Sequence, residues 1–245
     1  MKILLAPAET KNEGGNEKAF SKENFFLQKN FSFRKEVFDS YEKYVQSLSL
    51  EELSSWFGIK RIDDVKKYQE SLKNKASMKA IQRYNGVAFD ALDYNSLNSS
   101  EQNYIDDNVI LFSNLFGPIK ANDKIPDYKY KQGAKLPNMS VEKFYKDNFT
   151  DDLDEYIGDE IIDLRAGFYE KFYTPKNATV IMLKFLKDGK VVSHWAKHYR
   201  GMVLNTLTKK NVQSITEFMN TQIPGLRLVE IQEKKDIRLL IMDIV

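Results

Sequence analysis

Residues 3 to 11 read Ile3-Leu4-Leu5-Ala6-Pro7-Ala8-Glu9-Thr10-Lys11, an apolar run that breaks at once into a short polar segment. The apolar run predicts a buried strand, and Pro7 restricts the backbone of the turn that follows it. In open α/β sheets, ligands collect outside the carboxyl ends of the strands. The turn is therefore a candidate site in which Glu9 and Lys11 supply an acid and a base, although a solvated turn without function explains the same residues.

Apolar runs and turn signals along the rest of the chain predict both strands and helices. Strands are expected at 109–112, 160–164, 178–185, 191–195, 226–232 and 237–244, with a hairpin turn at Lys187-Asp188-Gly189-Lys190. Apolar residues at helical spacing predict helices over 33–47, 49–58, 62–68, 76–84, 140–148, 201–207 and 212–219. This mixture predicts an α+β fold, in which a single mixed β-sheet is surrounded by helices and residues 1–245 form one domain.

The composition narrows the class of protein. The 245 residues carry a formal net charge of +2 and contain no cysteine, which excludes disulfides, thiol nucleophiles and thiolate metal sites. No apolar run is long enough to cross a bilayer and no signal peptide is visible, so we expect a cytoplasmic protein without a membrane partner. The net charge alone is too small to indicate nucleic-acid binding, but the lysines are clustered, and such clustering permits a basic face.

Several standard constellations are missing from the sequence. It contains no GxGxxG, no GxxxxGK[ST] and no GxSxG motif. His194 and His198 have the i, i+4 spacing of a helical metal site, but Trp195 stands where HExxH has its glutamate, and the predicted strand over 191–195 breaks that spacing. We therefore expect no bound metal and no cofactor.

Basic residues follow several of the predicted strands. Arg165 comes directly after the strand at 160–164, and Lys197 and Arg200 follow the strand that ends at Trp195. Arginine offers a planar fork of donors that suits carboxylates and phosphates. Together with Lys11 these side chains predict an anion-binding cleft, and Gly201 beside them would let a ligand approach closely. The alternative is that Asp163 and Arg165 pair with neighbouring residues and hold the sheet.

A second candidate site lies in the irregular stretch between residues 113 and 133. Aromatic and basic residues alternate at Tyr128, Lys129, Tyr130 and Lys131. Alternating rings and charges can stack bases and follow phosphates. An edge strand with alternating tyrosine and lysine is the plain alternative.

A third candidate is a helix–turn–helix outline between residues 49 and 68. Ser49 and Glu52 predict a capping box at the start of a helix that stops near Gly58, and a further helix follows. Backbone amides of a helix-hairpin-helix turn bind phosphate. Lys60 stands where such hairpins usually have a second glycine, and an ordinary helix connection explains the same residues.

Taken together, five segments resemble the YaaA (peroxide stress resistance) family, in matching order and spacing across nearly the whole chain. They are Leu4 to Lys11, Tyr84-Asn85-Gly86-Val87-Ala88-Phe89-Asp90-Ala91-Leu92, the loop from Leu115 to Gly133, Ile162-Asp163-Leu164-Arg165 and Lys197-His198-Tyr199-Arg200-Gly201. The resemblance implies a cantaloupe-like fold with a helix-hairpin-helix element and a positively charged cleft that binds DNA. It also implies a role in limiting damage by hydrogen peroxide, with an indirect effect on intracellular iron.

Two hypotheses of function follow. In the first, the protein is an oxidative-stress response protein that binds DNA; its contacts come from Lys11, Lys60, Tyr128, Lys129, Lys131, Arg165, Lys197, Arg200 and Gly201. In the second, it is an enzyme that acts on a small anionic or nucleobase-like substrate in the same cleft. Glu9 is then the acid or base, and Asp163 either orients Arg165 or takes the role of Glu9.

Overall fold

The computed structural model describes residues 1–17 and 19–245, apart from the side chain of His194. The strands of its main sheet are β1 Lys2–Leu5, β3 Val109–Ser113, β4 Gly117–Lys120, β6 Glu160–Leu164, β7 Thr179–Lys187, β8 Lys190–Val191, β9 Leu226–Lys234 and β10 Ile237–Ile244. Within the described residues these eight strands lie in the order β4-β3-β1-β6-β7-β10-β9, with β8 paired to β7. A separate antiparallel pair joins β2 (Ser77–Lys79) to β5 (Lys124–Pro126).

The centre of the main sheet is parallel and its edges are antiparallel. β1 runs parallel to β3 and β6, and the parallel run continues through β7 to β10. β4 and β9 pair antiparallel at the two edges. Ile3, Leu4 and Leu5 are all buried, as expected for a central strand covered on both faces. The predicted mixed sheet is therefore confirmed.

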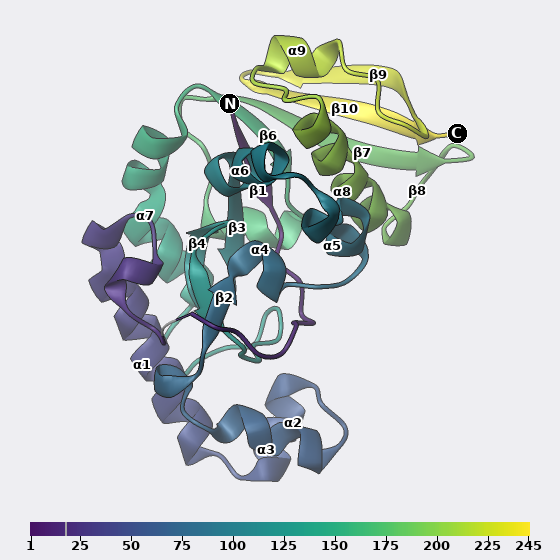
Figure 1. Ribbon diagram of the computed structural model, residues 1–245. Helices are drawn as coiled ribbons and strands as arrows, with labels where there is room; N and C mark the ends of the chain where they lie inside the picture. The colour runs from purple at the N-terminus through teal and green to yellow at the C-terminus, as the bar shows by residue number, and fades with distance from the viewer. Residues whose placement is uncertain (18) are drawn as a thin grey trace.

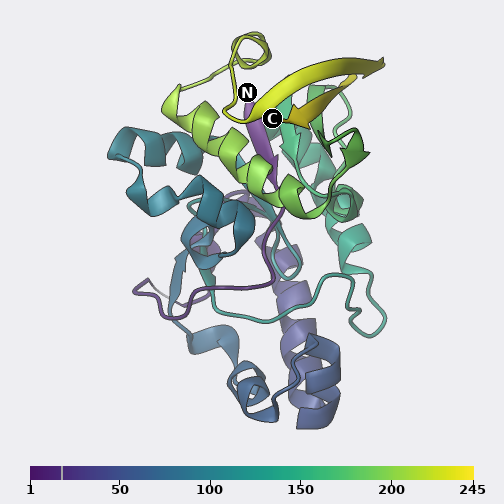
Figure 2. The ribbon, with the colours of Figure 1, turned by 90° about the vertical axis from the view of Figure 1, so that its right-hand side faces the viewer.

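Helices surround this sheet (Figure 1). They are α1 Phe31–Ser47, α2 Leu50–Phe57, α3 Ile62–Gln69, α4 Ala80–Arg83, α5 Val87–Leu92, α6 Ser99–Asn108, α7 Val141–Ile157, α8 His194–Lys209 and α9 Ile215–Met219. α2 and α3 lie together at the end of the molecule farthest from β9 and β10, in both Figure 1 and Figure 2. None of the helices in the described ranges has the length and apolar character that crossing a lipid bilayer requires.

Some local predictions are confirmed at the level of single residues. The capping box forms as expected, because the Ser49 hydroxyl accepts a hydrogen bond from the Glu52 amide and the Glu52 carboxylate accepts one from the Ser49 amide. α2 then ends at Gly58, whose φ of 67° is left-handed. The turn between Lys187 and Lys190 joins β7 and β8 as a hairpin.

Other predictions are wrong where pairing or burial overrides the local pattern. The strand predicted over 191–195 ends at Val191, and α8 begins at His194 because its buried residues recur at helical spacing. His194 and His198 therefore share one helix. The helix predicted over 76–84 is split, since Ser77–Lys79 pairs with β5 before α4 starts. Similarly, the irregular stretch from 117 to 137 contains β4, which pairs with the preceding strand β3, and β5, whose partner β2 lies far away in the sequence.

The parallel strands place several turns at one edge of the sheet. Leu5 at the end of β1 is in register with Leu111 of β3 and with Leu164 of β6. The segments that follow these strands therefore lie beside one another, and 6–11 lies next to 165–167. This edge is where an open sheet places its ligands.

Candidate functional site

A pocket of about 370 Å³ opens at this edge of the sheet. Its walls come from the turn after β1, the start of α5, the end of β6 and the first turns of α8. The lining residues are Leu5, Ala6, Pro7, Ala8, Glu9, Thr10, Asn85, Gly86, Val87, Ala88, Phe89, Gln132, Leu164, Ala166, Tyr169, Lys197 and Arg200. Most of these are apolar, and few charges stand among them, as is typical of small-molecule sites.

Three charged side chains line this pocket. Glu9 is exposed, and its carboxylate accepts a hydrogen bond from the backbone N–H of Gln132 at 3.4 Å. Lys197 and Arg200 lie three residues apart on α8, so their side chains leave one face of the helix. Arg200 is partly buried, which lowers its pKa, while the nearby Asp163 carboxylate opposes that effect. The structure therefore brings Glu9, Lys197 and Arg200 together, as the sequence predicts.

Lys11 is not among the residues that line the pocket, and its ammonium contacts the backbone of the turn after β1. Its Nζ donates to the carbonyl oxygens of Ala8 (3.4 Å) and Glu9 (3.2 Å) and lies 4.2 Å from the centre of the Tyr128 ring. Burial of the ammonium, reinforced by the charge of Lys129, lowers the pKa of Lys11 to about 7. In this position Lys11 stabilises the conformation of the turn that carries Glu9, which is a different role from the predicted direct contact with an anion.

The lowered pKa of Lys11 predicts how stability depends on pH. Between pH 7 and 9 the unfolded chain keeps a proton on Lys11 that the folded chain has begun to lose. The free energy of unfolding should therefore gain a rising contribution from this group as the pH increases through that window. Urea denaturation of wild type and Lys11→Met at several pH values measures it: the difference between the two curves should grow with pH. Parallel curves would contradict the prediction, and Lys209→Met, at an exposed lysine, is the control.

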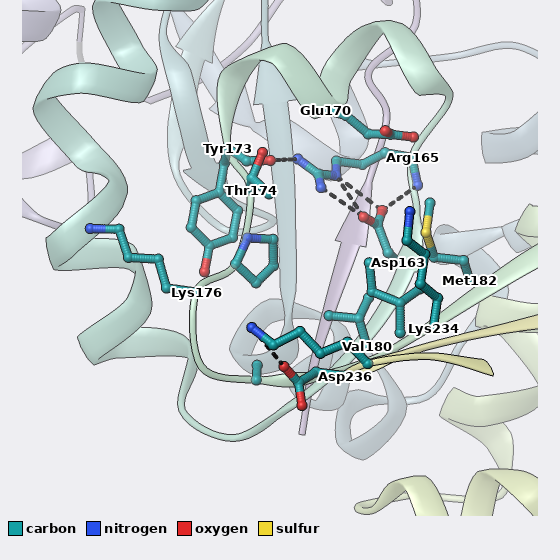
Figure 3. A pocket seen from close by; sticks show the side chains of 14 residues that line it. Asp163, Arg165, Glu170, Tyr173, Thr174, Lys176, Val180, Met182, Lys234 and Asp236 are labelled. Atoms are coloured by element: carbon teal, nitrogen blue, oxygen red, sulfur yellow. Dashed lines mark hydrogen bonds and ion pairs between the residues drawn. The ribbon is translucent and has the colours of Figure 1, made fainter.

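Asp163 and Arg165 form a buried ion pair (Figure 3). Their side chains are 3% and 1% exposed. Arg165 Nε and Nη2 donate to the Asp163 carboxylate at 2.6 to 3.2 Å, and Nη1 donates to the carbonyl oxygens of Tyr169 and Tyr173. The guanidinium also stacks over the Phe112 ring at 4.6 Å. Every nitrogen of the guanidinium is thus engaged within the protein.

This pair corrects two predictions from the sequence. Arg165 is predicted to bind an anion and Asp163 to act as an acid or base, but each satisfies the other's charge instead. The pair fixes the segment after β6 and forms part of the wall of a second pocket, of about 280 Å³ (Figure 3). In the structure Asp163 is therefore paired with a neighbouring residue, as in the alternative to a role in binding or catalysis.

The predicted stacking strip from Tyr128 to Lys131 also requires correction. Tyr128 is 2% exposed, and its hydroxyl shares hydrogen bonds with those of Tyr84 (2.8 Å) and Ser113 (2.7 Å). Tyr130 is buried as well, with its ring 5.0 Å from that of Trp56. Neither ring can stack on a base, because both belong to the core. Lys129 is partly exposed and Lys131 is exposed, so the basic half of the strip remains on the surface.

The α2–α3 turn lies beside this loop. A side-chain atom on Gly58 would be 3.3 Å from the Lys131 side chain, and the Trp56 indole donates to the Lys135 carbonyl oxygen at 3.1 Å. Lys60 is exposed in the same turn. The structure therefore gathers Lys60, Lys131 and Lys135 at one end of the molecule.

Gly201 has a packing role that differs from the predicted ligand approach. A Cβ on Gly201 would overlap the carbonyl oxygen of Ala88 and lie 2.9 Å from the Cβ of Ala91. α8 and α5 therefore cross in close contact at this point, and no space remains for a ligand. Through this contact Gly201 positions α8, which carries Lys197 and Arg200.

Among the side chains that the structure describes, no three His, Asp or Glu residues form a group that could hold a metal ion. The rings of Trp195 and His198 lie edge to face, 6.4 Å apart.

Known proteins similar to this chain point to one family. A family model described as peroxide stress protein YaaA matches residues 1–232. A Campylobacter jejuni protein described as uncharacterized is 43% identical over 235 residues, covering 96% of this chain and 95% of its own. The chain belongs to the peroxide stress protein YaaA family. A UPF0246 protein of Corynebacterium glutamicum is 31% identical over 247 residues, covering 96% and 98%, and one of Malacoplasma penetrans is 27% identical over 238 residues, covering 93% of each.

Membership of the YaaA family supports a role in the response to peroxide stress. The pocket also contains residues that the sequence does not predict as site residues, among them Asn85, Gly86 and Phe89. Asn85, Gly86, Phe89 and Gln132 lie within segments that resemble the family. Tyr169 lies outside those segments, and its uncharged phenol belongs to no charge pattern, so no signal in the sequence points to it.

Proposed function

We propose that this protein binds DNA during peroxide stress and holds one nucleotide in the pocket at the carboxyl edge of its sheet. The observation that carries the proposal is the composition of that pocket. Lys197 and Arg200 provide two cations on one wall, and apolar and aromatic residues such as Phe89 and Tyr169 provide the others. A phosphate pairs with the cations, while a base is covered by the apolar walls.

The size of the pocket favours one nucleotide over a double helix. Its volume of about 370 Å³ lies in the range of small-molecule sites. A duplex whose major groove alone is about 12 Å wide does not enter such a space. Proteins that handle a single base from DNA take it out of the stack, or use a strand that is already unpaired.

The surface outside the pocket supports a longer DNA path. Gln132, which lines the pocket, follows Lys131 directly, and Lys131 lies against the turn at Gly58. Lys60, Lys131 and Lys135 are exposed there and would contact backbone phosphates. The α2–α3 turn thereby takes the role of a helix-hairpin-helix element in the proposal, with lysines making the phosphate contacts.

Removing both pocket cations should weaken DNA binding and flatten its salt dependence. Each phosphate contact contributes roughly 0.7 to 0.9 to the slope of log affinity against log salt concentration. Because Lys197 and Arg200 hold one phosphate between them in this proposal, the double variant Lys197→Ala/Arg200→Ala should lower the magnitude of that slope by roughly 0.7 to 0.9 in the same titration. Fluorescence anisotropy of a labelled oligonucleotide, titrated at several salt concentrations, measures it.

Lys209→Ala is the matched control, because Lys209 is exposed at the opposite end of the same helix. It should leave the slope unchanged. Equal slopes for wild type and the double variant, with both proteins folded by circular dichroism, would overturn the proposed role of the pocket.

A second function is favoured by the position of Glu9. Its carboxylate lines the same pocket as Lys197 and Arg200, so an acid or base stands beside an anion site. In an enzyme acting on a small anionic or nucleobase-like substrate, Glu9 transfers a proton and the cations hold the substrate. Mass spectrometry of an oligonucleotide incubated with wild type and with Glu9→Gln separates the two functions. An enzyme changes the mass of the oligonucleotide in wild type but not in Glu9→Gln, whereas a DNA-binding protein leaves the mass unchanged and Glu9→Gln keeps or gains affinity.

A further inference from the structure

Trp195 differs from the other aromatic residues of this protein in its exposure. Its side chain is 48% exposed, and it is the one aromatic ring among the large hydrophobic side chains left exposed in the described part of the chain. The second tryptophan, Trp56, packs against the rings of Tyr41, Tyr44 and Tyr130. An exposed indole offers a flat apolar face, on which an unpaired base can stack.

Positive charge surrounds this indole. The Lys187 ammonium lies 5.2 Å from the centre of the ring. Lys190 is exposed in the adjoining β8, and Lys197 is exposed two residues further along α8. An exposed ring bordered by several cations is the combination that binds an unpaired base together with its phosphates.

Trp195 lies on the same helix as two of the pocket residues. It lies in the first turn of α8, and Lys197, two residues on, lines the pocket. Two residues span about 3 Å along a helix axis, and successive residues turn by about 100°. The two side chains therefore leave α8 on nearly opposite sides, and a strand that leaves the pocket at Lys197 has to turn around the N-terminal end of the helix to reach the indole.

We propose that Trp195 is a stacking platform for a second, unpaired base, and that the substrate of this site is single-stranded DNA rather than an intact duplex. This inference rests on the proposed function, because the first nucleotide of the strand occupies the pocket. The cations favour nucleic acid over an apolar protein partner, which would have to desolvate Lys187 and Lys190. The Lys187 ammonium already lies over one face of the ring. A base therefore stacks on the other face or displaces Lys187 from this one.

Intrinsic fluorescence gives a direct test. Trp56→Phe leaves Trp195 as the single tryptophan, because the chain has two. Titration with oligo(dT) should quench its fluorescence, with a midpoint equal to the dissociation constant from anisotropy of the same labelled oligonucleotide. A matched duplex should give weaker quenching and weaker binding. Quenching by anionic lipid vesicles instead of oligo(dT) would overturn the proposal and identify a lipid surface.

The anisotropy titration does not need the Trp56→Phe substitution. It therefore tests the proposal even if the Trp56→Phe variant fails to fold. Trp195→Ala should weaken oligo(dT) binding about ten-fold, and Trp195→Phe should restore most of the loss. Val191→Ala, at a more exposed apolar residue of the adjoining strand, should change nothing.

The outcomes separate the two proposals. Unchanged affinity in Trp195→Ala, together with a loss in Lys197→Ala/Arg200→Ala, overturns the stacking platform and leaves the proposed function in place. Wild-type protein that binds neither oligo(dT) nor duplex overturns both. Equal affinity for strand and duplex overturns the assignment of single-stranded DNA.

Discussion

Arg165→Met should destabilise the protein by about 3–5 kcal/mol, which is the usual cost of leaving one partner of a buried ion pair unpaired. The Asp163 carboxylate is 3% exposed and would lose every side-chain donor that it has in the structure. The carbonyl oxygens of Tyr169 and Tyr173 would lose their donor as well. Urea denaturation at pH 7 measures the change in the free energy of unfolding.

The double variant Asp163→Leu/Arg165→Met provides the control. Replacing a buried ion pair by apolar residues of similar size is often neutral or stabilising, so the double variant should recover most of the lost stability. If Arg165→Met loses less than about 1 kcal/mol, as is typical of surface pairs, then the pair is not buried in solution as it is in the structure.

Gly201→Ala should also be strongly harmful, although alanine is the better helix former. Helix propensity alone favours alanine by about 1 kcal/mol at an interior position of α8. The added Cβ, however, would overlap the Ala88 carbonyl oxygen and press on Ala91, and overpacking of this kind costs about 1–3 kcal/mol. Since backbone on α5 cannot move aside as a flexible side chain would, we expect net destabilisation.

The same substitution should weaken ligand binding, because the α5–α8 contact positions Lys197 and Arg200 at the pocket. Thermal denaturation and the anisotropy titration measure the two effects. Gly167→Ala is the matched control: a Cβ there meets the Glu170 carboxylate at an ordinary 3.6 Å. A Gly201→Ala protein that is more stable than wild type would show that the two helices are farther apart than in the structure.

Features that depend on neighbouring residues were predictable from the sequence. The capping box between Ser49 and Glu52 and the end of α2 at Gly58 follow from side chains three residues apart and from glycine's freedom at positive φ. The turn after β1 was recognised because an apolar strand leads into Pro7. The rule that parallel strands end at one edge explains the place of Glu9 after β1, but Lys197 and Arg200 reach that edge on α8 and not after the strand that the sequence predicts.

The direction in which each side chain points could not be predicted in this way. Tyr128 and Lys129 alternate in the sequence as they would in a nucleic-acid-binding strip, yet Tyr128 is buried by Tyr84 and Ser113, which come from distant segments. Arg165 has the same charge as Arg200, and the sequence predicts a place after a strand for both, although Arg200 lies on α8. Which of them is paired and which lines a pocket depends on where Asp163 lies.

The sequence by itself determined the mixed sheet, the main helices, the edge at which a site would form and the family, since strand and helix patterns are local and the family's segments keep their order. The tertiary structure alone decided which cations are free to meet a ligand. Burial and ion pairing depend on how the whole chain packs. Arg165 is paired with Asp163, and Lys11 donates to the backbone of its own turn. Lys197 and Arg200 line the pocket, and Trp195 is exposed on the same helix.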